Sequence, residues 1–136
     1  KSYLDRGMVP VTFGDVVRDE VRGLSICSGD QLMAALAKEF RPSKVIFVTD
    51  VDGVFTADPT QDPEAKLIPT VDEQVLDSLP RTERNIDVTG SIFAKIRYMI
   101  DMASLTDECL VLNGKVPGRL EAAIRGDDVI ASKVVS

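Results

Sequence analysis

Residues 45–59 read VIFVTDVDGVFTADP, an apolar run that ends in two aspartates one residue apart and then a glycine. A short β-branched run bounded by turn-forming residues predicts a buried strand. Ligands of open α/β sheets bind just beyond the carboxyl ends of such strands. Asp50 and Asp52 fall at that place. The stretch therefore predicts a strand of an α/β sheet with a candidate active or binding site at its end.

Strand and helix patterns alternate on both sides of this stretch. Upstream, we expect a strand at 9–13, a hairpin within 16–26, and a helix that opens at Ser28, since Ser28 and Gln31 have the spacing of a capping box. Downstream, the pattern predicts a strand at 66–71, helices at 72–79 and after residue 91, a strand at 108–112, a helix at 117–125 and a strand at 129–135. This alternation predicts an α/β fold, a mostly parallel doubly wound sheet with helices on both faces.

Composition narrows the function classes. The 136 residues carry a net charge of −6, with 44% hydrophobic residues, and suit a single domain spanning 1–136. No apolar run approaches the ~20 residues of a membrane span, and no basic patch suggests a nucleic-acid partner. We therefore expect a cytoplasmic protein. The absence of histidine from these residues excludes Ser-His hydrolysis, His-ligated zinc and a His general base here.

The two cysteines, Cys27 and Cys109, lie far apart, and their spacing matches no metal site. Each stands in an apolar segment, so we expect buried free thiols. Residues 1–7 read KSYLDRG, which is typical of the last turns of a helix closed by glycine. We expect the chain to be the carboxyl-terminal part of something longer.

Residues 87–95, at the start of a predicted helix, have the features of a phosphate site. They read DVTGSIFAK, a glycine-containing helix start followed by Lys95. Free backbone N–H groups and the positive end of a helix dipole favour an anion there. On the residues alone, the ordinary interpretation of Lys95 is a solvated lysine on the polar face of the helix. Asp30 could be an ordinary first-turn acid, and Asp50 and Asp52 could be turn formers.

Taken in order, the short motifs at the ends of the predicted strands and at the starts of the helices resemble the carboxyl-terminal, nucleotide-binding half of the amino acid kinase superfamily. Within that superfamily they resemble the isopentenyl phosphate kinases. The motifs that carry the resemblance are V-P-V-x-x-G-D at 9–15, S-G-D at 28–30, T-D-V-D-G…D-P at 49–59, D-V-T-G…K at 87–95 and N-G-x-x-P-x-R at 113–119. Each is weak alone, but five in register over essentially the whole chain are specific. Ser91 departs from the pattern, which usually has a second glycine there.

The resemblance implies phosphoryl transfer from ATP to isopentenyl phosphate, giving isopentenyl diphosphate for isoprenoid biosynthesis. It implies a homodimer, and Mg²⁺ held mainly by the nucleotide phosphates rather than by residues of this chain. It assigns Thr49, Asp50, Phe55 and Asp58 to the ATP site, Gly90 and Lys95 to the ATP phosphates, Gly14 to the acceptor phosphate, and Asp30 to organising the phosphate-binding lysines. Lys95 and Asp30 are thus the catalytic candidates. The family's other phosphate-binding loop belongs to an amino-terminal half that these residues do not contain.

Three alternatives remain open. A fosfomycin kinase-like member of the superfamily is a close sibling, whereas a uridylate kinase-like member would share the 49–59 loop but lacks the Ser-Gly-Asp and Asn-Gly pattern. A haloacid-dehalogenase-type phosphatase would use Asp50 as nucleophile and Asp52 as general acid. That signature normally opens its domain, whereas two strands and a helix precede it here. It also needs a later strand that ends in an acidic pair, whereas Asp127 and Asp128 follow the end of a predicted helix. A catalytically silent nucleotide-binding module is the third.

Overall fold

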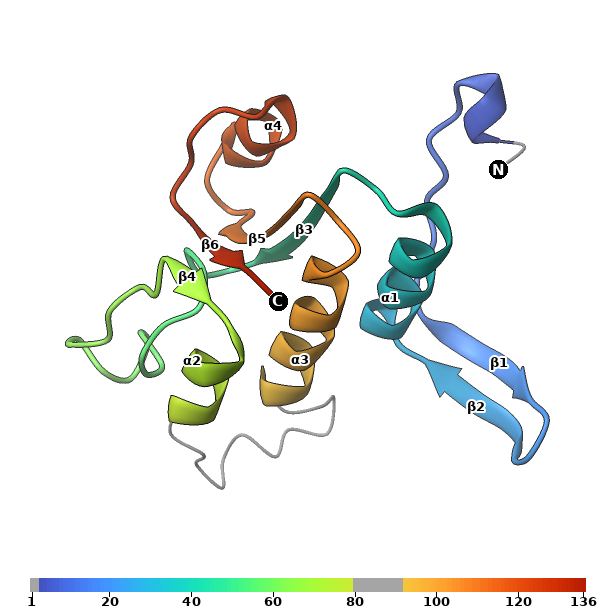
Figure 1. The fold of residues 1–136 in the computed structure, drawn as a ribbon, viewed down its shortest axis with the longest axis horizontal. Coiled ribbons are helices and arrows are strands. Elements are labelled where there is room, and N and C mark those ends of the chain that lie inside the picture. Colours follow the sequence, from blue (N-terminus) through green and yellow to red (C-terminus); the bar gives the residue numbers. More distant parts are fainter. Residues whose placement is uncertain (1–2, 80–91) are drawn as a thin grey trace.

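The structure is a computed structural model that describes residues 3–79 and 92–136. Its elements follow in chain order (Figure 1). They are η1 (Leu4–Arg6), β1 (Asp15–Asp19), β2 (Gly23–Cys27), α1 (Gly29–Phe40), β3 (Lys44–Thr49), β4 (Thr70–Val71), α2 (Glu73–Ser78), α3 (Ile92–Ala103), β5 (Glu108–Asn113), α4 (Arg119–Arg125) and β6 (Ala131–Val134). The predicted helix cap at 89–91 lies outside the described residues.

A four-stranded sheet with the order β3-β5-β6-β4 forms the centre of the fold. β3 pairs with β5 in parallel, as β4 does with β6, while β5 and β6 are antiparallel. Helices cover both faces, since α3 packs on one side of β5 and α4 on the other. The predicted fold class, an α/β fold with a mostly parallel sheet and helices on both faces, is confirmed.

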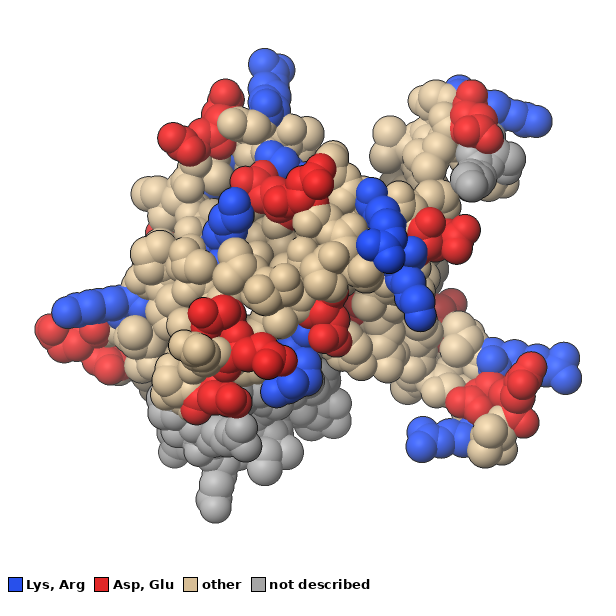
Figure 2. All heavy atoms as spheres, viewed as in Figure 1, with Lys and Arg blue, Asp and Glu red and all other residues tan. Residues whose placement is uncertain are grey.

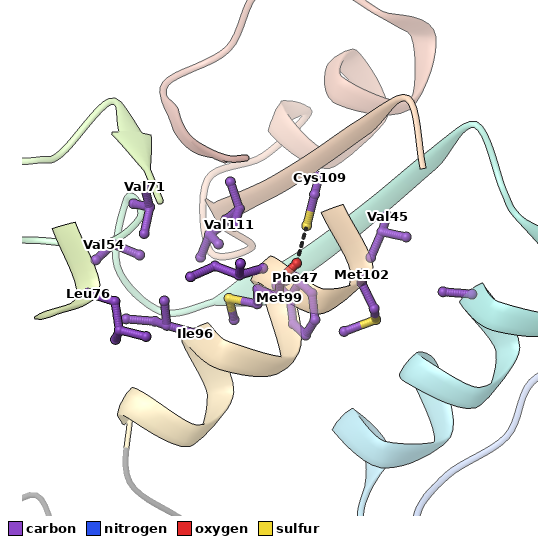
Figure 3. Packing of buried hydrophobic residues seen from close by; sticks show 13 residues of the cluster. Val45, Phe47, Val54, Val71, Leu76, Ile96, Met99, Met102, Cys109 and Val111 are labelled. Atoms are coloured by element: carbon purple, nitrogen blue, oxygen red, sulfur yellow. Dashed lines mark hydrogen bonds between the residues drawn. The ribbon is translucent and has the colours of Figure 1, made fainter. Parts of the chain in front are cut away.

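The core explains why β5 is an unbroken apolar run. Cys109 and Val111 point to one face and join the larger cluster, in which Ile96 and Met99 of α3 pack against strand residues (Figure 3). Leu110 and Leu112 point to the other face, against Ala123 of α4. Successive strand residues face opposite sides, so a strand covered on both sides must be apolar throughout.

The capping box predicted for α1 is present. The Gln31 N–H donates to Ser28 Oγ at 3.2 Å, and the Ser28 N–H donates to Gln31 Oε1 at 2.9 Å. These two bonds satisfy helix-end donors that would otherwise lack partners. They also set the position of Asp30 in the first turn of α1.

The strand predicted at 9–13 is wrong, although the hairpin that follows it forms as β1 and β2. Val9, Val11 and Phe13 are between 76% and 92% exposed. A strand needs a neighbour to satisfy its backbone groups, and within residues 3–79 and 92–136 none pairs with this segment. Figure 1 shows η1 and the hairpin extending away from the sheet.

Other predictions need smaller corrections. The strand at 66–71 shrinks to β4, because Leu67 instead forms an isolated bridge with Phe55. α4 begins at Arg119 rather than at residue 117, since Gly118 has a left-handed φ of 79°. Cys27, on the hairpin, is only half-buried, whereas Cys109 is buried as expected. In the part of the chain described, no helix has the length and apolarity to cross a membrane.

Candidate functional site

The first part of the candidate site lies at the carboxyl ends of the parallel strands β3 and β5, which we call the carboxyl edge of the sheet. Thr49 ends β3 opposite Asn113, which ends β5. The turn after β5 folds back onto β3, because the Gly114 N–H donates to the Thr49 carbonyl at 2.9 Å. Thr49 Oγ1 also donates to the Val51 carbonyl at 2.8 Å. The two turns that follow the strands are thus tied together at the edge where α/β sheets bind ligands.

Asp50 and Asp52 have different surroundings at this edge. The Asp50 carboxylate is exposed and lies 3.5 Å from the Lys115 ammonium. Asp52 Oδ1 accepts hydrogen bonds from the Arg119 guanidinium and, at 3.1 Å, from Asn113 Nδ2. The Arg119 bond, followed by the Asn113 bond, lowers the pKa of Asp52 from its ordinary value. Asp52 is therefore held as a carboxylate with its partners supplied by the protein.

The second part of the candidate site joins α1 and α3. The Lys95 ammonium lies 3.4 Å from an Asp30 carboxylate oxygen. Asp30 is in the first turn of α1, where the helix dipole favours an acid. Lys95 is the fourth residue of α3, where the dipole disfavours a cation, and its side chain is still 45% exposed. An exposed ammonium at the start of a helix can neutralise an incoming anion.

Gly14 packs directly against the start of α1. A Cβ atom there would stand 2.6 Å from the Cys27 carbonyl oxygen and 2.8 Å from the Gly29 nitrogen. Both are backbone atoms, so a side chain at Gly14 would force the backbone to move. Gly14 and the Ser28–Asp30 segment belong to separate motifs of the sequence, and the structure brings them together.

Phe55 and Asp58 lie farther along the loop after β3. Phe55 is half-buried and bridges to Leu67. The Asp58 carboxylate accepts from the Thr60 hydroxyl at 2.7 Å and from the Thr60 N–H at 2.9 Å. These two bonds lower the pKa of Asp58. The remaining predicted residue, Gly90, lies outside the described residues.

The geometry does not suit a phosphatase of the haloacid dehalogenase type. A general acid must carry a proton at working pH, whereas Arg119 and Asn113 stabilise the ionised form of Asp52. The acidic pair at 127–128 lines a hollow together with Lys44 and Glu108. Those two residues begin β3 and β5, whereas Asp50 follows the end of β3. The pair thus lies at the opposite edge of the sheet from Asp50.

Two residues at the edge were not among the predicted site residues. Asn113 and Arg119 enter the sequence-based prediction only as the first and last residues of the motif at 113–119. Both contact Asp52, and the signal that could have indicated them is the N-G-x-x-P-x-R motif itself. Figure 2 shows that acidic and basic side chains of the described residues are interspersed over the visible face.

The fold is that of a family of phosphotransferases. Residues 1–113 match the family model described as the amino acid kinase family, and the chain belongs to that family. It is 42% identical over 137 residues to the isopentenyl phosphate kinase of Methanothermobacter thermautotrophicus, covering 98% of this chain and 51% of the relative. A solved isopentenyl phosphate kinase structure superposes with a TM-score of 0.76 at 35% identity, covering 98% of this chain and 48% of the other.

The predicted resemblance to isopentenyl phosphate kinases is confirmed by these matches. The glutamate 5-kinase of Myxococcus xanthus is more distant, at 32% identity over 133 residues, with 95% of this chain and 34% of that enzyme covered. The chain spans about half the length of the isopentenyl phosphate kinases it matches.

Proposed function

We propose that this chain is the nucleotide-binding part of a kinase that transfers the γ-phosphoryl group of ATP to isopentenyl phosphate. The Asp30–Lys95 pair carries the proposal, because it holds an exposed ammonium at the start of α3, where a phosphate can bind. The 42% identity to an isopentenyl phosphate kinase supports the acceptor.

In this proposal, each part of the candidate site has a role in positioning or charge stabilisation. Phosphoryl transfer needs little covalent chemistry from the protein, and no histidine or reactive thiol is required. Thr49, Asp50, Phe55 and Asp58 line the nucleotide site, and Gly14 contacts the acceptor phosphate through its backbone. Lys95, with Gly90 before it, neutralises charge on the phosphates, while Asp30 orients Lys95.

Magnesium would neutralise and align the ATP phosphates in this site. The donors at the edge fit an ion held mainly by those phosphates, since Asp52 is already bonded to Arg119 and Asn113. Asp50 is the more exposed of the two carboxylates at this edge, and Lys115 lies beside it. In residues 3–79 and 92–136, no three cysteine or acidic side chains gather as a cation site.

We also propose that residues 1–136 are the carboxyl-terminal part of a longer kinase. The exposed apolar side chains of 9–13 and of the β1–β2 hairpin support this, because such surface normally packs against another part of a protein. The relatives are about twice as long as the matched region. By the same resemblance, the complete enzyme is a homodimer in the cytoplasm.

Calorimetry with ADP and Mg²⁺ tests the nucleotide site on the 136-residue chain. We expect saturable binding, and little phosphoryl transfer to isopentenyl phosphate by this chain alone. A folded chain that releases no heat at millimolar ADP would contradict the nucleotide site. Robust turnover by the 136 residues would contradict the half-enzyme interpretation.

A chimera tests the acceptor. The amino-terminal part of the Methanothermobacter relative, joined to this chain, should convert isopentenyl phosphate to isopentenyl diphosphate, followed by phosphorus NMR. Fosfomycin, UMP and glutamate serve as competing acceptors. Preferential phosphorylation of one of these three would overturn the isopentenyl phosphate assignment while preserving the kinase class. Magnesium-dependent phosphate release from a generic ester, lost in Asp50→Asn, would instead indicate a phosphatase.

A further inference from the structure

Asp52, Asn113 and Arg119 form a clamp across the carboxyl edge of the sheet. Asp52 lies in the turn after β3, Asn113 ends β5, and Arg119 begins α4. One oxygen, Asp52 Oδ1, accepts from both of the other side chains. The Arg119 side chain is only 12% exposed, against 39% for Asp52. Because the guanidinium is largely shielded from water, loss of its carboxylate partner would leave an unpaired charge and would be unfavourable. The clamp therefore holds the turn, β5 and α4 in one arrangement.

Two further anchors secure the same turn on either side of Asp52. At its start, the Thr49 carbonyl accepts from the Gly114 N–H at 2.9 Å. At its end, the buried Ser132 hydroxyl accepts from the Val54 N–H at 2.9 Å and donates to the Ile68 carbonyl at 2.6 Å. The turn 49–54 is therefore held at three points. Asp50 lies between the attachments at Thr49 and Asp52, and its carboxylate is exposed.

The position of the clamp separates it from an ordinary surface ion pair. It joins the ends of two neighbouring parallel strands at the edge where ligands of α/β sheets bind. A loop that is ordered before its ligand arrives avoids the entropy cost of ordering on binding. Asp52 Oδ1 is engaged by Arg119 and Asn113, so we assign Asp52 an effect on the ligand that is exerted through the turn.

We propose that Arg119 is a positioning residue that, through Asp52 and Asn113, preorganises the turn 49–54 for the nucleotide. This inference rests on the proposed nucleotide site. In this proposal, neither Arg119 nor Asp52 takes part in a chemical step. It predicts that weakening the clamp reduces nucleotide affinity through a larger entropy loss on binding.

The test compares Arg119→Ala and Arg119→Lys with Arg125→Ala in the 136-residue chain. Arg125 is on the same helix and makes an exposed pair with Glu121, so it is the matched control. Hydrogen exchange of peptides over 49–54 reports the turn, and exchange over β5 reports the core. Calorimetry with ADP and Mg²⁺ gives the affinity and its entropy.

We expect Arg119→Ala to weaken ADP binding by about tenfold, mainly through entropy, and to raise exchange in 49–54 but not in β5. Arg119→Lys keeps the charge but loses the planar fork, so it should recover part of the affinity. In an Asp52→Asn background, Arg119→Ala should add little further loss. Arg125→Ala should match the unmodified chain in both measurements.

The outcomes that contradict the inference also show whether the proposed nucleotide site fails with it. If the unmodified chain binds no ADP, both the proposed function and the nucleotide role of the clamp are overturned. If the unmodified chain binds ADP and Arg119→Ala binds it equally well, the preorganisation inference is wrong while the proposed function stands. If exchange rises evenly through β3, β5 and α4, Arg119 acts as a general brace and the inference is again wrong.

Discussion

The Lys95 ammonium and the Asp30 carboxylate lie 3.4 Å apart, although 65 positions separate them in the chain. The pair connects the first turn of α1 to the first turns of α3. Each residue alone had an ordinary surface explanation, since first-turn acids and exposed lysines are common. Their pairing places a cation at the edge of a proposed phosphate site.

Replacing Lys95 should reduce turnover without unfolding the enzyme. In the chimeric enzyme, Lys95→Ala removes a cation that we expect to stabilise charge on the transferring phosphoryl group, so kcat should fall by about 10²–10³. Arginine should restore only part of the rate, because its planar fork is larger than an ammonium. Arg97→Ala is the control, since Arg97 is exposed and pairs with Glu73. Near-normal turnover in Lys95→Ala would leave Lys95 as a solvated surface residue.

Replacing Asp30 should act through Lys95. Asp30→Asn keeps the size of the side chain but removes the charge that holds the ammonium, so we expect a smaller loss of kcat than in Lys95→Ala. Half-exposed ion pairs contribute about 0–1 kcal/mol to folding, so Tm should change little. In a Lys95→Ala background, Asp30→Asn should have almost no effect on kcat. Additive losses would show that Asp30 acts independently of Lys95.

Gly53→Ala should destabilise the fold. Gly53 is buried with φ of 156°, and a Cβ there would meet the Ser132 hydroxyl and stand 2.9 Å from the Ser132 nitrogen. Because a backbone atom must move, we expect a loss of about 1–3 kcal/mol in the free energy of unfolding, measured with urea. Gly29→Ala is the matched control, since nothing lies within 4 Å of its added Cβ. Equal stability of the two variants would refute the crowding argument.

The two thiols should differ in reactivity. Burial raises the pKa of the Cys109 thiol to about 12, and its Sγ lies 3.8 Å from the Met99 carbonyl oxygen. Since the thiolate is the reactive form, a thiol reagent should modify one cysteine of the folded chain, the half-buried Cys27. Cys109 should react only after unfolding. Fast modification of a folded Cys27→Ser variant would contradict this assignment.

The contribution of Asp52 to stability should depend on pH. Arg119 and Asn113 lower its folded pKa below the unfolded value of about 3.9. The stabilisation is therefore present above about pH 4 and is lost as the pH falls through the lowered folded pKa. Arg119 is the charged side chain that pairs with Asp52. The difference in unfolding free energy between the unmodified chain and Asp52→Asn should shrink from about pH 7 to about pH 3, and a constant difference would be inconsistent with the clamp.

Local elements were predictable because their determinants lie within a few residues. The capping box at Ser28 and Gln31 joins groups three residues apart, and it forms as expected. The apolar runs of β3 and β5 satisfy both faces of a covered sheet. The hairpin at 16–26 also follows from its own pattern. The family resemblance depended on the order of short motifs, which is likewise visible without a structure.

The partners of those elements were not predictable from the pattern. The run at 9–13 has the composition of a strand, but a strand also needs a hydrogen-bonding neighbour, and the described residues supply none for it. The antiparallel direction of β6 follows from how the chain returns after α4, not from its residues. In the same way, Asp52 looked like a turn former until the fold brought Arg119 to it from 67 positions away.

Local patterns along the chain were enough to predict most helices and strands, the α/β class, and the order of motifs that marks an amino acid kinase. Three contacts became visible only in the folded chain: Asp30 faces Lys95, Gly14 lies against the start of α1, and Asp52 is bound by Arg119. The two groups of features differ in the range of the interactions that produce them. Helix caps and strand alternation depend on neighbours along the chain, whereas ion pairs and close backbone contacts depend on how distant segments pack.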